Sequence, residues 1–419
     1  MFGMDSGVAL KYSCWDFLFT FGGLLLFLFD IALDAWAVVT FYQEKAYFSL
    51  GLLLLFLLGS SALAQVYSWL WYRYDNYETK TKVEKCLNRL SLKLLHVLQL
   101  GVYFRYAGVM EASVRSFISK SRDPEGVAVF LTHDLSMLRL IEAFSESAPQ
   151  LVLMLAIILQ RGALDPMTMF KAVGSVSAIA CSVTMYHRSL RSFLPDKHQQ
   201  QICSSLVYFL WNQLLIAPRL AAISLFASVL PCYVFAHFLC SWMILFFCAW
   251  QAKTTFMDSA GGEWLFRATV GLIWYFSWFN VVEGQTRYRS LLYHLYIMVD
   301  IVLLCGLWCW QVHIKSPYFD ITLLHAIITS VIIIVLFIFG ILVKGLYYMY
   351  CHPKIGKHEM NGSPSGLDSD TVDLAEVKSH DDDLQSDSML RSIRSAPEPA
   401  PAQKRENKRM RKLAENFYS

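Results

Sequence analysis

Three long apolar runs constrain the fold of this chain more than any other feature. Residues 48–71 and 321–343 contain no acidic side chain, lysine or arginine, and residues 203–250 contain only Arg219. About 20 consecutive apolar residues allow an α-helix to cross the hydrocarbon core of a bilayer. Each crossing must also satisfy its own backbone hydrogen bonds, which a helix does within a single segment. We therefore predict an all-α polytopic membrane protein.

The spacing of the apolar segments predicts the topology. Eight segments are long and apolar enough to be transmembrane helices, and they cover residues 14–41, 47–72, 133–160, 169–186, 204–226, 228–250, 291–312 and 320–349. Two further segments, 87–118 and 263–284, are interrupted by charges such as Arg105 and Glu283, and we predict re-entrant or partial helices there. Two spans, one partial helix and two spans occur in that order twice, which favours two structurally related halves.

Basic residues gather in the loops on one side of the predicted bundle. They are Arg73, Lys80, Lys82, Lys85, Arg89, Arg188, Arg191, Lys197, Arg287 and Arg289. Because lysine and arginine are enriched in cytosolic loops, we expect this side to face the cytosol. Eight crossings then place both termini in the cytosol. The first apolar segment lacks the features of a cleaved signal peptide, so we expect it to be retained.

The composition changes abruptly after residue 350. Serine, aspartate, proline, lysine and arginine dominate residues 351–419, and hydrophobic periodicity is lost until LAENFY near the end. Such a composition is typical of disordered segments. We therefore predict a transmembrane domain at 1–350 and a disordered cytosolic regulatory tail at 351–419.

Charged residues inside the predicted spans are the strongest functional signal. Asp30 and Asp34 lie one helical turn apart in the first span. A second set recurs at helical spacing in the third span and comprises Arg139, Glu142, Glu146 and Gln150. An ionised side chain at the centre of a bilayer costs about 2.5–3.5 kcal/mol on insertion scales. These residues must therefore be paired with one another or be in contact with water.

Two interpretations of these charges remain open at this point. One is a buried ion-pair network that only fixes helix register; the other is a hydrophilic passage for ions or lipid headgroups. Arg219 and Arg139 are candidate cations for Asp30 and Asp34. Asp16 would extend the acidic line toward the cytosol, and Asp300 is a lone acid in the seventh span.

Motifs for other chemistries are not evident in the sequence. The ten cysteines are scattered, mostly within apolar segments, and no pair has metal-ligand spacing supported by histidines. No phosphate-binding loop of the type G-x-x-x-x-G-K-[ST] occurs. We expect no cofactor, no metal, no nucleic-acid partner and no covalent catalysis.

Several strings in the membrane region resemble the XK-related protein family. They are DIALDAWAVV, YSWLWYRYD, LRLIEAFSESAPQLVLMLAIILQ, YFLWNQLLIAPR, EWLFRATV and YFSWFNVVEGQTR, and the resemblance runs from about residue 14 to 350. It implies eight spans, two partial helices and a phospholipid scramblase of the plasma membrane that exposes phosphatidylserine on dying cells. It also implies a single-span immunoglobulin-type chaperone, basigin or neuroplastin. The intramembrane charges of the family fall on Asp16, Asp30, Asp34, Arg139, Glu142, Glu146 and Arg219.

The resemblance further implies activation by an executioner caspase that cuts the tail. Asp370 and Asp373 bound the tetrapeptide DTVD, which has the aspartates that these proteases favour at both ends, although Leu374 departs from the small residue favoured next. Asp387 is the fallback cleavage position. Ser392 and Ser395, in RSIRS, are candidate phosphorylation sites.

Two alternatives to the scramblase remain. The chain could be a non-scrambling scaffold or adaptor that assists another lipid-handling protein. Some XK relatives resemble such partners more than they resemble independent catalysts. An ion-coupled transporter using the same acidic residues is the other alternative.

Overall fold

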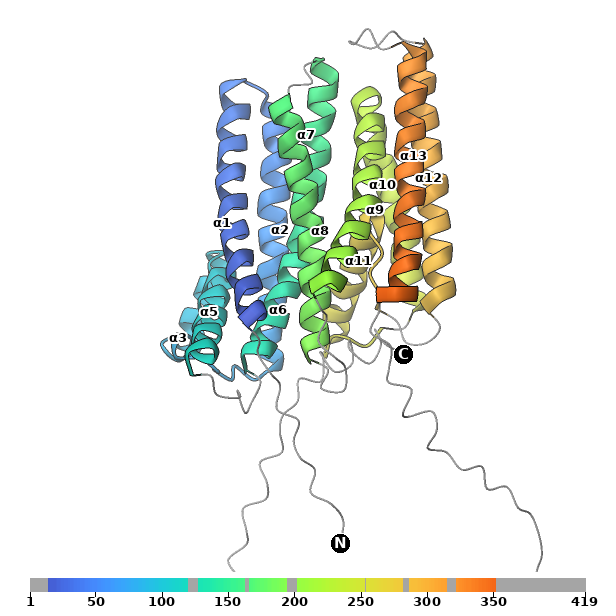
Figure 1. Ribbon diagram of the computed structural model, residues 1–419. Helices are drawn as coiled ribbons and strands as arrows, with labels where there is room; N and C mark the ends of the chain where they lie inside the picture. The colour runs from blue at the N-terminus through green and yellow to red at the C-terminus, as the bar shows by residue number, and fades with distance from the viewer. Residues whose placement is uncertain are drawn as a thin grey trace, which may run out of the picture. The chain divides into compact units, whose positions relative to one another are not determined.

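The computed structural model describes residues 14–119, 127–162, 166–193, 202–252, 254–281, 286–314 and 322–351. All regular structure in these residues is helical (Figure 1). The longer helices are α1 Cys14–Gln43, α2 Tyr47–Tyr74, α6 Val127–Glu142, α7 Ala148–Arg161, α8 Pro166–Phe193, α9 Ile202–Val229, α10 Pro231–Gln251, α12 Thr286–Ile314 and α13 Leu323–Leu346. The shorter ones are α3 Lys82–Lys85, α4 Arg89–Val97, α5 Gly101–Ser119 and α11 Ala260–Phe276.

Seven helical segments in the described residues are long and apolar enough to cross a membrane. They are α1, α2, the continuous helix Val127–Arg161, α9, α10, α12 and α13. This confirms the predicted all-α polytopic fold. The fourth predicted span, residues 169–186, corresponds to α8, which has 28 residues but carries Lys171, His187, Arg188 and Arg191 and so is more polar. The count of eight crossings stays a prediction.

The chain reverses or breaks where its sequence removes helical hydrogen bonds. Pro231 opens α10 directly after Leu230, at the turn that its position predicts. The first partial segment is divided into α4 and α5, and Gln99 between them has a left-handed φ of 61°. The second, α11, ends at Phe276, where Trp274 Nε1 donates to the carbonyl oxygen of Phe279 at 2.6 Å. The predicted end at residue 284 was therefore too late.

Helix packing differs between the two halves of the described chain. In the second half, α9 packs closely against α12, α13, α7 and α8, and α10 packs along α11. In the first half, α6 packs against α8, α5 and α2, whereas α1 lies mainly against α2 and α5 and touches α8 at few positions. Figure 1 shows α1 and α2 side by side, with α5 next to the lower part of α1. The sparse contact between α1 and α8 leaves room for the cavities described below.

A wide helical turn interrupts the helix that carries most of the intramembrane charges. Residues Ala143–Ser147 form the π-helical segment η1 between α6 and α7, and a second one, η2, spans Tyr347–Cys351. Proline lies in the first turn of α7, where its missing N–H cannot continue the regular bond ladder. The extra residue changes the direction of the side chains that follow it.

Candidate functional site

Two adjoining cavities separate α1 from α6, α7 and α8. The first, of about 80 Å³, lies between Asp16 and Asp30 of α1 and is lined also by α5, α6 and α8. The second, of about 190 Å³, extends from Asp30 to Phe41 and is lined by α1, α7 and α8. Asp30 and Ala178 line both cavities, so the two meet at these residues. We call this region the polar seam and define it by its charged lining residues, Asp16, Asp30, Asp34, Arg139, Lys171 and Arg188.

One end of the polar seam is bounded by an ion pair between α1 and α8. Arg188 Nη2 lies 3.2 Å from Asp16 Oδ1, and both side chains are about one-tenth exposed. Arg188 also donates through Nη1 to Ser205 Oγ at 3.3 Å and lies over the ring of Phe19. Asp16, a predicted site residue, is thus joined to a cation that the sequence assigned to a cytosolic loop. The pair holds α1 against α8 at this end.

The middle of the polar seam contains one guanidinium shared by two carboxylates. Arg139 Nη1 lies 2.7 Å from Glu142 Oε2, and Nη2 lies 3.6 Å from Asp30 Oδ2. The Arg139 guanidinium also lies 4.7 Å from the centre of the Phe27 ring. The structure therefore brings together Asp30, Arg139 and Glu142, and it shows Arg139 rather than Arg219 as the cation that pairs with Asp30.

Further along the polar seam, two acids have neutral partners. Gln150 Nε2 donates to Asp34 Oδ1 at 2.7 Å. The Ser60 hydroxyl donates to the carboxylate of Glu146, which is also within hydrogen-bonding reach of Asp34. Lys171 Nζ lies 3.7 Å from the centre of the Trp36 ring at the side of the second cavity. Asp30 and Glu142 thus share the guanidinium of Arg139, whereas Asp34 and Glu146 bond to the Gln150 amide and the Ser60 hydroxyl.

Arg219 and Asp300, which the sequence assigned to the same path, form a separate buried cluster. Arg219 has no exposed side-chain surface and pairs with Asp300, which also lies 3.0 Å from His237 Nε2. Arg219 Nε donates to the carbonyl oxygen of Tyr275 at 3.1 Å. Neither residue lines the polar seam, because α9 packs directly against α12 and leaves the pair enclosed. Arg219 and Asp300 therefore lie in a cluster of their own, apart from the polar seam.

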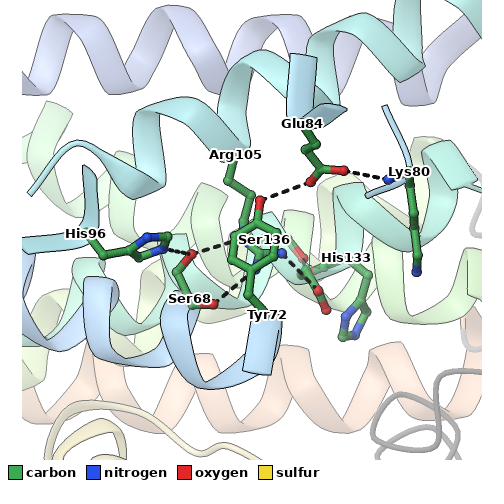
Figure 2. Close-up of polar contacts among 9 residues, drawn as sticks. Ser68, Tyr72, Lys80, Glu84, His96, Arg105, His133 and Ser136 are labelled. Carbon is green, nitrogen blue, oxygen red and sulfur yellow. Dashed lines mark hydrogen bonds and ion pairs between the residues drawn. The ribbon is translucent and has the colours of Figure 1, made fainter. Parts of the chain in front are cut away.

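A polar cluster that the sequence did not single out fixes the partial helices. Arg105 of α5 donates through Nε to Ser68 Oγ at 3.1 Å and through Nη2 to the Ser68 carbonyl oxygen at 3.2 Å. Its Nη1 lies 3.2 Å from Asp134 Oδ2, and its guanidinium lies 4.2 Å from the centre of the Tyr72 ring. Figure 2 shows Arg105 next to Ser68 and Tyr72, which come from α2. Arg105 thus joins α5 to α2 and α6.

His96 completes this cluster on α4. Its Nδ1 lies 2.8 Å from the carbonyl oxygen of Leu92, which can only accept, so Nδ1 carries a proton. Burial lowers the pKa of His96, so the ring is neutral and Nε2 accepts from the Ser68 hydroxyl at 2.9 Å. Tyr72 in turn donates to Glu84 Oε1 at 2.9 Å (Figure 2). Arg105 and Asp134 are visible in the sequence as charged residues, but their pairing depends on how α5 folds back.

Several predicted residues lie outside the residues that the structure describes. They are Asp370, Asp373, Asp387, Ser392 and Ser395. Among the described residues, no group of His, Cys, Asp and Glu side chains has an arrangement suited to a metal ion.

Comparison with known proteins gives a consistent set of relatives. The family described as XK-related protein matches residues 18–353. The chain is 41% identical to XK-related protein 8 of Tetraodon nigroviridis over 99% of both chains. It is 41% identical to XK-related protein 8 of Gasterosteus aculeatus over 99% of this chain and 100% of the relative. Identity to XK-related protein 8 of Pan troglodytes is 34%, over 94% of this chain and 92% of the relative.

Proposed function

The chain belongs to the XK-related protein family, and we propose that it is a phospholipid scramblase whose headgroup path is the polar seam. One observation carries the proposal: adjoining cavities among apolar helices are lined by charges from Asp16 at one end to Lys171 at the other. Charged and polar groups inside a membrane bundle mark substrate pathways more often than they mark inert structure.

The chemistry of the seam suits a lipid headgroup. A headgroup that crosses hydrocarbon must leave water, and that transfer is costly unless other polar groups replace the lost hydrogen bonds. The seam supplies cations for phosphate at Arg188, Arg139 and Lys171, and carboxylates for ammonium at Asp30 and Asp34. The acyl chains would remain in the bilayer next to α1, whose outer face exposes large apolar side chains such as Leu25 and Phe29. Movement along such a path is downhill and bidirectional.

We further propose that the resting protein is closed and that an executioner caspase opens it. The proposed cut follows Asp373, with Asp387 as the second choice, and phosphorylation of Ser392 and Ser395 would add a second control. The proposed location is the plasma membrane, with both termini cytosolic and a basigin- or neuroplastin-type chaperone as partner. The sequence DTVD and the resemblance of the chain to its family support these statements.

Reconstitution tests the proposed function directly. Purified protein, with and without caspase treatment, is placed in liposomes that contain an acyl-labelled phospholipid, and exposure of the label to an impermeant quencher is measured. We expect movement of lipid between leaflets after cleavage and little before it. A variant with Asp370→Asn and Asp373→Asn should resist activation, whereas Asp387→Asn should not.

Two results would redirect the proposal. Absence of lipid movement in both forms, even with the chaperone co-reconstituted, would favour a non-scrambling scaffold. Ion flux without lipid movement would favour an ion-coupled transporter.

A further inference from the structure

We propose that the outward face of α4 binds an anionic phospholipid of the cytosolic leaflet. Arg89 and Lys93 would hold the phosphate groups of its headgroup, and the apolar side chains of the helix would lie along its acyl chains. Neither cation lines the polar seam, so the inference goes beyond the proposed transport path. It uses the predicted orientation, in which the basic loop between α2 and α4 is cytosolic.

The helix α4 exposes most of its surface. Of its nine residues, only Leu92 and His96 are buried. The hydrogen bond between Ser68 and His96 fixes this buried side against α2 (Figure 2). Residues three and four positions apart share one face of a helix, so the remaining apolar side chains form a stripe that points away from the bundle. They are Leu90, Leu94 and Val97, continued by Leu98, and their exposed fractions range from 57% to 79%.

Two cations border this apolar stripe. Arg89 and Lys93 lie one helical turn apart, and both are exposed. Among the described residues, neither is in an ion pair. Residues 85–110 contain no aspartate or glutamate. Like charges at this spacing repel each other, so an anion bound between them would stabilise the helix.

A cavity of about 260 Å³ adjoins the start of α4. Arg89 and Asn88 line it together with Tyr77 and Thr79 from the loop after α2. The Arg89 guanidinium lies 4.0 Å from the centre of the Tyr77 ring. A stacked guanidinium keeps its N–H groups available in its own plane, where they can donate two bonds to one phosphate. The cavity therefore offers a place for a headgroup beside the cation.

One carboxylate, that of Glu84, also borders this cavity. The Tyr72 hydroxyl donates to its Oε1 at 2.9 Å. The backbone N–H groups of Lys80 and Thr81 donate to its Oε2 at 2.8 and 3.2 Å. Glu84 is 4% exposed, so its charge is compensated by donors within the protein and is largely shielded from a ligand.

The combination of cations and an apolar stripe favours a membrane lipid over a soluble phosphate compound. Arg89 is the first residue of α4, next to the loop, whereas Leu94 and Val97 lie further along the helix. A phospholipid would place its phosphates at the cations and its chains along the stripe. Basic helices with an exposed apolar face are typical of proteins that bind the anionic cytosolic leaflet. A soluble phosphate compound would leave the stripe unused.

A lipid titration tests the charged part of the site. Thermal unfolding of the uncut, full-length protein in a neutral detergent is followed while dioctanoyl phosphatidylinositol 4-phosphate is added, and we expect a saturable rise in melting temperature. One cation near an anionic lipid surface is worth about fivefold in affinity. Lys93→Gln should therefore weaken binding about fivefold, and Arg89→Gln combined with Lys93→Gln about 25-fold if the effects add.

The baseline and a matched control accompany this titration. Arg89 and Lys93 are exposed and outside the ion pairs of the described residues, so the melting temperature without lipid should not change in either variant. Lys45→Gln removes an exposed lysine from the loop between α1 and α2, at the other end of α2. It should bind the lipid as the wild type does.

A second comparison tests the acyl-chain contact. Inositol 1,4-bisphosphate carries the headgroup without chains and should bind more weakly than the lipid. Leu94→Asn should weaken binding of the lipid but leave binding of the free headgroup unchanged. Dioctanoyl phosphatidylcholine, which has the same chains and no net charge, should give no saturable rise.

Three outcomes would overturn the assignment. One is equal affinity of the wild type and the double variant for the lipid. Another is equal affinity of the lipid and the free headgroup, which would assign the site to a soluble phosphate compound. The third is displacement of the lipid by a peptide of residues 368–387, with the same dependence on Arg89 and Lys93, which would assign the face to the acidic part of the tail.

Discussion

Arg139 pairs with two carboxylates in the middle of the polar seam. Its guanidinium is within 4 Å of Asp30 and Glu142, and it lies over Phe27. The pairing explains how acidic residues can persist among apolar helices, because each carboxylate next to Arg139 is partly compensated. Asp34 and Glu146, in contrast, accept hydrogen bonds from the neutral Gln150 amide and Ser60 hydroxyl.

Replacing Arg139 should therefore cost more stability than replacing an exposed arginine. In Arg139→Gln the carboxylates of Asp30 and Glu142 lose their only described cation, and we expect a loss of about 3–5 kcal/mol. The measurement is thermal unfolding in detergent together with surface abundance in cells.

Arg161→Gln is the matched control for that substitution. Arg161 pairs with Glu44 at 2.7 Å, but the two side chains are 48% and 36% exposed, so the change should cost less than about 1 kcal/mol. Equal stability of the two variants would show that the Arg139 pairs contribute little to folding.

At the scale of elements, the Arg105 cluster and the close contact of α9 with α13 determine how helices are held. Arg105 bonds to α2 and α6 from α5, and it does so with three of its nitrogens. The contact between α9 and α13 depends on a glycine, since a Cβ at Gly340 would lie 2.9 Å from Leu215 Cδ2 and 3.0 Å from the backbone of Leu214. Each arrangement predicts a specific mutant phenotype.

Arg105→Lys should loosen α4 and α5 while conserving charge. A lysine cannot reproduce the fork that reaches the Ser68 hydroxyl, the Ser68 carbonyl and Asp134 together. We expect faster amide hydrogen exchange in residues 89–119, with residues 202–229 unchanged as the internal reference. Exchange rates equal to those of the wild type in both regions would show that Arg105 does not hold α4 and α5 in place.

Gly340→Ala should separate α9 from α13 and cost about 1–3 kcal/mol of stability, because the added methyl group meets backbone atoms that cannot move aside. Gly345→Ala is the matched control on the same helix, since no heavy atom lies within 4 Å of its Cβ position. Alanine is the better helix former, so this control should be neutral or slightly stabilising. Equal melting temperatures for the two variants would contradict this packing argument.

At the scale of the whole molecule, the number of crossings determines which loops share a side of the membrane. Among the residues that the structure describes, seven helical segments are apolar enough to span, and α8 decides whether these crossings number seven or eight. The polar character of α8 follows from its position along the seam, where Lys171, Ser182 and Arg188 line the cavities. A helix that borders a polar cavity needs fewer apolar residues than one that faces lipid on all sides.

Cysteine labelling tests the predicted topology. Cys86, after α2, and Cys232, at the start of α10, are both exposed free thiols. In single-cysteine variants, a membrane-impermeant maleimide should label Cys232 on intact cells and Cys86 only after permeabilisation. Labelling of both from the same side would exclude the eight-span orientation.

The sequence alone determined the class of fold and the main charged residues, because insertion into lipid is governed by local properties: run length, hydropathy and the cost of each buried charge. It also singled out Asp30, Arg139 and Glu142, which the structure brings into contact with one another. Only the tertiary structure decided which charges pair. From the sequence, Arg219 was as good a candidate partner for Asp30 as Arg139. In the structure α9 packs against α12, and Arg219 pairs with Asp300. The loose contact of α1 with α8 opens the cavities beside Arg139. Pairing depends on distances between helices far apart in the chain, and no local pattern encodes those distances.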